Sequence, residues 1–191
     1  MIELPISREN ALELVKKYNT HEQDLIHYLE SEAVMRELAK HLNLSPKEID
    51  YWAMLGLLHD IDWGLTKDNV EAHLTKMPEI LKQKGFDKEF IEIILSHGYG
   101  FEELPHLHQK KRTERIHHAL AASETITGLI HAYALMRGKK ISDMEPKGLS
   151  NKFKNKAFAA KVEREIILEI ENLGITLDEF FKIAIDGIKK I

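Results

Sequence analysis

Signals that begin and end helices recur along the whole chain, whereas alternating runs of β-branched residues are hard to find. The strongest start signal surrounds Pro46. Ser45 stands at the capping position, Pro46 in the first helical turn and Glu48 three residues after the serine. An apolar run follows this signal, so the pattern predicts a helix that ends near His59. The chain as a whole is therefore predicted to be all-α.

Similar signals predict the other helices. Thr20 and Gln23 form a candidate capping box, Asp87 is a candidate cap, and Thr176 pairs with Glu179. Gly85 ends an apolar periodic segment. The predicted helices cover about residues 22–42, 70–85, 88–97, 113–136, 149–174 and 177–190.

The length and composition favour one domain. With 191 residues, of which 43% are hydrophobic and 30% charged, the chain can bury one substantial core. We interpret residues 1–191 as a single helical domain, with a core bundle over about 20–137 and C-terminal helices over about 150–190. The sequence contains no internal repeat.

Several classes of protein are disfavoured. No apolar run approaches the roughly 18 residues of a membrane span, and the N-terminus lacks a signal-peptide pattern, so we expect a cytoplasmic protein without a membrane partner. A formal charge of -4 argues against broad nucleic-acid binding. The sequence leaves a homo-oligomer open.

Histidine and aspartate form the notable constellation. The chain has no cysteine and eleven histidines, so any metal must be held by imidazole and carboxylate. His27 lies in the first long predicted helix, the pair His59 and Asp60 ends the next, His73 starts a third and His97 ends a fourth. We predict that helix ends bring these groups together around one divalent ion, or around two bridged by Asp60.

This order of residues resembles the HD-domain superfamily of metal-dependent phosphohydrolases. Within that superfamily the sequence more closely resembles a group of small predicted HD hydrolases of bacteria and archaea. These proteins carry motifs similar to "LLHDIDW", "SHGYG", "TGLI" and "FKNKAFAAKVERE". The dipeptide alone is a weak signal, but its place after one helical histidine and before two more is fairly specific.

The resemblance implies an all-helical bundle with a metal site between helices. By it, His27, His59 and Asp60 would hold a first ion together with a late acidic residue, and His73 and His97 would hold a second ion bridged by Asp60. The late ligand in the superfamily is usually aspartate. Here the only nearby acidic residue is Glu124, which has the same carboxylate on a longer arm.

The resemblance also implies hydrolysis of a small phosphate ester, such as a nucleotide. Asp60 and Asp62 are the candidate catalytic residues, although Asp62 can equally cap the following turn. Trp63 and Tyr99 can wall a pocket or belong to the core. The candidates for contacts with the phosphorylated molecule are His117, His118, Lys152, Lys156 and Arg164.

Two other functions fit the same residues. A two-metal site also resembles that of HD relatives such as myo-inositol oxygenase, which hold two iron ions and use dioxygen. Glutamate at position 124 also leaves open a nucleotide-sensing or metal-binding module with little turnover. The sequence does not distinguish Fe, Mn, Zn and Mg.

Overall fold

The computed structural model describes residues 3–191, and this part of the chain is helical with no strand. The all-α prediction is therefore confirmed. In chain order the elements are α1 (Arg8–Tyr18), α2 (Glu22–His41), α3 (Pro46–Leu58), α4 (Trp63–Thr66), η1 (Val70–Ala72), α5 (Met77–Lys82), α6 (Lys88–Leu95), η2 (Ser96–Gly98), α7 (Arg115–Met136), α8 (Pro146–Lys154), α9 (Arg164–Leu168), η3 (Glu169–Leu173) and α10 (Leu177–Ile188).

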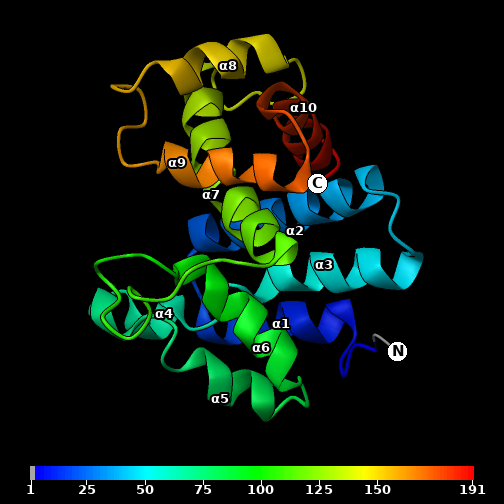
Figure 1. The fold of residues 1–191 in the computed structure, drawn as a ribbon, viewed down its shortest axis with the longest axis vertical. Coiled ribbons are helices and arrows are strands. Elements are labelled where there is room, and N and C mark those ends of the chain that lie inside the picture. Colours follow the sequence, from blue (N-terminus) through cyan, green and yellow to red (C-terminus); the bar gives the residue numbers. More distant parts are fainter. Residues whose placement is uncertain (1–2) are drawn as a thin grey trace.

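Helices α2 and α3 pack side by side in the middle of the molecule, where α7 also packs on α2 (Figure 1). Helices α8, α9 and α10 gather toward one end, and α4, α5 and α6 toward the other. A Cβ atom at Gly56 of α3 would lie 2.5 Å from the carbonyl oxygen of Ser31 on α2. Only glycine permits this close approach, which brings the C-terminal end of α3 to the middle of α2.

The predicted helix caps are mostly confirmed. The side chains of Ser45, Asp87 and Thr176 accept hydrogen bonds from the first turns of α3, α6 and α10. The capping box at Thr20 is wrong, because His21 precedes α2 and no side chain caps this helix. Asn19, which ends α1, has a buried side chain that donates hydrogen bonds to the carbonyl oxygens of Val15 and Ile61.

The helix predicted over residues 70–85 is wrong. Residues 70–72 form a single 3-10 turn, α5 begins only at Met77, and His73 between them is not helical. Leu74 adopts a positive φ of 65°, a conformation that disfavours a helix. Pro78 lies in the first turn of α5, where its missing N–H costs no intrahelical hydrogen bond. The chain does turn at Gly85, where φ is +88°, although α5 itself ends at Lys82.

The continuous helix predicted over residues 149–174 is also wrong. Helix α8 ends at Lys154, and residues 155–163 form a looped segment before α9. The Arg164 side chain donates hydrogen bonds to five main-chain carbonyl oxygens, which replaces the backbone bonding of a helix. These carbonyls belong to Phe153, Asn155, Phe158, Ala159 and Val162.

The core is continuous through α2, α3, α7 and α10, with Tyr28, Phe90, Phe180 and Phe181 among its largest fully buried side chains. Among the described residues, no helix has both the length and the hydropathy that crossing a membrane requires. Because α3, α6 and α7 are anchored in this core, the residues at their ends are held in fixed positions.

Candidate metal centre

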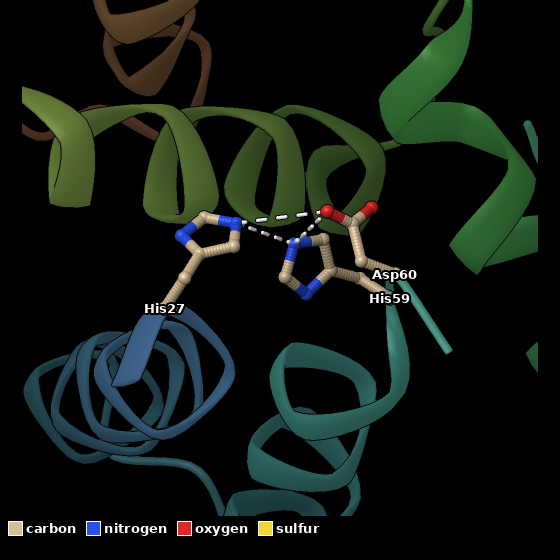
Figure 2. Close-up of side chains that lie close together, drawn as sticks. All are labelled: His27, His59 and Asp60. Atoms are coloured by element: carbon tan, nitrogen blue, oxygen red, sulfur yellow. Dashed lines mark hydrogen bonds and ion pairs between the residues drawn. The ribbon is translucent and has the colours of Figure 1, made fainter. Parts of the chain in front are cut away.

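The first cluster joins α2 to the end of α3. His27 projects from α2 toward His59 and Asp60, which follow the last turn of α3 (Figure 2). The two Nε2 atoms lie 3.0 Å apart, and Asp60 Oδ2 lies 3.7 Å from His27 Nε2 and 3.5 Å from His59 Nε2. These three atoms are close enough to bind one ion.

The second cluster uses the other oxygen of the same carboxylate. Asp60 Oδ1 lies 3.2 Å from His73 Nε2 and 3.1 Å from His97 Nε2. Asp60, His73 and His97 can therefore hold a second ion. Asp60 thus presents one oxygen to each pair of histidines, which is the geometry of a bridging ligand.

The remaining ring nitrogens fix the orientation of these imidazoles. His59 Nδ1 donates to the carbonyl oxygen of Gly56 at 2.8 Å, and His97 Nδ1 donates to that of Ile94 at 2.7 Å. A carbonyl oxygen only accepts, so the hydrogen of each neutral ring lies on Nδ1. Each Nε2 therefore presents a lone pair to Asp60 or to His27.

The neutral His27 ring also carries its hydrogen on Nδ1, which follows from two linked hydrogen bonds. The Thr127 hydroxyl donates its one hydrogen to the carbonyl oxygen of Glu124 at 2.7 Å, so it accepts from His27 Nδ1 at 2.8 Å. The neutral His27 and His59 rings then direct lone pairs at each other across 3.0 Å. This arrangement is repulsive alone and favourable around a cation, so the donor set fits a divalent metal.

The electrostatics favour the same protonation states. Burial lowers the pKa of His27, and it lowers the pKa of His59 to about 3, so both rings are neutral at pH 7. Burial opposes ionisation of Asp60, but the facing imidazoles hold its pKa well below the usual range. Burial likewise opposes protonation of His73, yet Asp60 and Asp62 outweigh it and raise that pKa to about 10. A proton on His73 then balances the Asp60 carboxylate, and binding of a metal would displace it.

Asp62 is fully buried beneath His73 and has no surface in the pocket described below. Its Oδ1 accepts from His73 Nδ1 at 3.1 Å and from the backbone N–H of Leu74 at 3.2 Å. Its Oδ2 accepts from the backbone N–H groups of Lys76 and Met77, each at 2.9 Å. Of the two roles open to Asp62 from the sequence, its contacts favour organising the following turn and orienting His73.

Sequence reasoning missed three residues that hold this centre. The Tyr28 hydroxyl donates to the carbonyl oxygen of Asp60 at 3.0 Å, and the Asn19 side chain accepts from the backbone N–H of Gly64 at 2.7 Å. Thr127 bonds His27 from 100 positions away. Tyr28 could have been noticed as the neighbour of His27, but Asn19 and Thr127 carry no local signal.

A pocket of about 550 Å³ opens above the second cluster. Its lining includes Asp60, His73, His97 and Glu124, and because these residues are buried or half-buried we call this part of the pocket its base. The Glu124 carboxylate belongs to neither three-residue cluster, although it faces the same space. Burial raises its pKa to about 7, a change that nearby His97 partly offsets. Trp63 also lines the pocket, whereas Tyr99 is buried and bonds Glu92.

The residues predicted to contact phosphate lie elsewhere in the described structure. Arg164 bonds main-chain carbonyls, His118 Nδ1 lies 2.6 Å from Glu169, and Lys152 lies over the ring of Phe158. His117 is buried with its ring beside Tyr99, and Lys156 is exposed; none of the five lines this pocket. Sequence reasoning missed Lys161, which does line it.

Comparison with known protein families gives one match, in which the HD-domain model covers residues 24–133, more than half of the chain. The chain belongs to the HD-domain family. His59 and Asp60 are the dipeptide after which HD domains are named, and every residue of both clusters falls within the matched range. Comparisons with curated proteins and with solved structures give no significant match.

Membership places this HD-domain protein in a superfamily of metal-dependent hydrolases. The matched range ends inside α7, so α8, α9 and α10 lie outside it. The segment between α8 and α9 nevertheless contributes Lys161 and Glu163 to the pocket. The pocket is thus built partly from the HD domain and partly from the C-terminal region.

Proposed function

We propose that the protein is a metal-dependent phosphohydrolase that acts on a small phosphate ester. The observation that supports this best is the position of Asp60, shared by two histidine pairs at the base of an open pocket. A carboxylate that faces two cation sites suits chemistry in which a phosphoryl oxygen and a water must be held together.

Each side chain has a defined part in this proposal. His27 and His59 would hold one ion through Nε2, His73 and His97 the other, and Asp60 would join them. Bound divalent ions would supply Lewis-acid stabilisation of the phosphoryl group and a water of lowered pKa. The water oxygen forms a bond to phosphorus, the bond to the ester oxygen breaks, and the alcohol leaves with a proton.

Residues around the ligands would maintain their geometry. Asp62 holds the His73 ring, and Thr127 holds the His27 ring, so that each Nε2 points at Asp60. Histidine ligands need such partners because the second ring nitrogen fixes both tautomer and orientation. Glu124, with its raised pKa, is a candidate for an additional ligand or for proton transfer to the leaving alcohol.

The test begins with protein purified without added metal or chelator, whose metal content is measured by elemental analysis. Phosphate release from a panel of monoesters is then followed with Mn²⁺, Mg²⁺, Zn²⁺ or Fe²⁺. We expect metal-dependent release by the wild type and none by Asp60→Asn, with full activity in the control His41→Ala, an exposed histidine at the end of α2. No release with any metal would refute the proposal, and iron-dependent oxygen consumption would instead favour the oxygenase function.

A further inference from the structure

The mouth of the pocket differs in charge from its base. The base carries the candidate metal ligands, whereas the mouth is formed by Glu103, Glu163 and Lys161, with the rings of Trp63 and Phe101 as walls. With about 550 Å³, the pocket has room for a small molecule that reaches from base to mouth. The charges at the mouth therefore bear on the end of the substrate remote from the reacting phosphate.

Carboxylates outnumber cations at this mouth. Within residues 3–191, neither Glu103 nor Glu163 forms a side-chain ion pair or hydrogen bond, and both are exposed. The half-buried Arg112 is neutralised by Glu169 through bonds of 2.7 and 2.8 Å. An adjoining hollow of about 440 Å³ shares both free carboxylates and adds further glutamates, Glu102 and Glu165. The approach to the pocket is thus negative.

The aromatic walls provide an independent observation. Lysine or arginine side chains lie over the rings of Tyr18, Tyr99, Tyr133, Phe153 and Phe158, but over neither Trp63 nor Phe101 in the described structure. The Trp63 ring is held edge-on to His73, with centroids 5.2 Å apart. Open aromatic faces beside carboxylates are the environment in which organic ammonium groups bind best.

The mouth is also held in place. Lys161 and Glu163 lie in the 155–163 segment, whose carbonyl oxygens are bound by Arg164. Lys161 is the one lysine or arginine among the described residues that line the pocket, so at the mouth a polyphosphate chain would meet one positive and at least two negative side chains. A single phosphate at the metal ligands and a cationic group at the mouth match this distribution.

We propose that the substrate is a small phosphate monoester whose alcohol carries an ammonium group, bound at the mouth by Glu103, Glu163, Trp63 and Phe101. This inference rests on the proposed phosphohydrolase function. The phosphate would lie at the metal ligands, at the base of the pocket.

A matched pair of esters separates charge from shape. Phosphocholine and 3,3-dimethylbutyl phosphate differ only in nitrogen or carbon at the branched centre. We expect the metal-loaded wild type to hydrolyse phosphocholine with at least a tenfold higher kcat/KM. In the double variant Glu103→Gln/Glu163→Gln the ratio should fall below threefold, whereas the control Glu89→Gln, an exposed residue of α6, should keep it.

Equal rates for the two esters, or a preference that survives the double variant, would overturn the inference. A stronger preference for adenosine monophosphate or for polyphosphates would overturn it too. Binding of choline to the metal-loaded protein, measured by calorimetry against 3,3-dimethylbutanol, provides a second readout. If no ester is hydrolysed but choline binds and the double variant weakens that binding tenfold, the ammonium site at the mouth stands and the phosphohydrolase proposal fails. Absence of both choline binding and a charge preference refutes the inference alone.

Discussion

His27 Nε2 and His59 Nε2 lie 3.0 Å apart although each nitrogen, in the neutral ring, carries a lone pair rather than a hydrogen. The hydrogens are drawn to the opposite sides of the rings by Thr127 and by the carbonyl oxygen of Gly56. Two lone pairs at this distance repel each other, and a cation held by both nitrogens would remove that repulsion. The relationship joins α2 to α3 and leads directly to the first prediction.

Loss of metal should depend on which ligand is removed. Asp60→Ala should remove all bound metal, because Asp60 belongs to both clusters, while His27→Ala and His97→Ala should each remove about one of two ions. Elemental analysis of each variant measures this, with circular dichroism to show that the helices remain. Exposed His41 provides the control, His41→Ala. A full metal complement in Asp60→Ala would contradict the bridged site.

Glu124→Asp should keep or raise the metal content. Aspartate is the usual late ligand of HD domains, and position 124 already faces Asp60 and His97 across the base of the pocket. Titration of the metal-free variant with Mn²⁺, alongside the wild type, gives the affinity. Sharply weaker binding would instead show that the α7 backbone is positioned for the longer side chain.

Asp62→Asn should weaken metal binding, although Asp62 does not line the pocket and so makes no contact with substrate. The amide retains one acceptor oxygen, so His73 or the backbone N–H groups at the start of α5 lose a partner. We expect affinity at the second cluster to fall about 10–100-fold. The free energy of unfolding should fall by about 1–3 kcal/mol. The control is Asp68→Asn, an exposed acid in the same loop region. Unchanged affinity would remove Asp62 from the metal centre.

Stability should depend on pH through Glu30. This carboxyl is only 4% exposed and has no hydrogen-bond or ion-pair partner within residues 3–191; burial raises its pKa to about 7. The folded chain therefore binds more protons than the unfolded chain between the ordinary glutamate pKa and about 7, and its stability falls as pH rises through that window.

Glu30→Gln should remove the loss of stability that ionisation of Glu30 causes at high pH. We expect the variant to be more stable than the wild type by about 1–3 kcal/mol at pH 8.5 and to gain little at pH 5, where Glu30 is already neutral. Urea unfolding at both pH values measures the difference, and the exposed Glu171→Gln serves as control. An equal gain at both pH values would mean that ionisation of Glu30 is not the cause.

Arg164→Lys should loosen the segment before α9. An ammonium group cannot reach five carbonyl oxygens that the guanidinium now bonds, so we expect a loss of about 2 kcal/mol or more in unfolding free energy. Cleavage by chymotrypsin after Phe153 or Phe158 should become faster. The control is Lys154→Met, and equal cleavage rates in wild type and Arg164→Lys would contradict the bracing role.

The sequence by itself determined the helical class, the caps at Ser45, Asp87 and Thr176, and the histidines and Asp60 that form the candidate metal centre. These features depend on local chemistry. A capping side chain bonds only the first turn of its own helix. The order of the candidate ligands along the chain is likewise enough to indicate the HD pattern.

Tertiary structure decided the rest, because long-range partners override local helix signals. Buried Asp62 takes the backbone N–H groups that a continuous helix from residue 70 would use internally, and Arg164 does the same to the carbonyl oxygens of residues 153–162. The tautomer of His27 depends on Thr127, 100 residues away. The mouth of the pocket is likewise composed of residues from separate segments, among them Trp63, Glu103 and Glu163, that only the packed fold brings together.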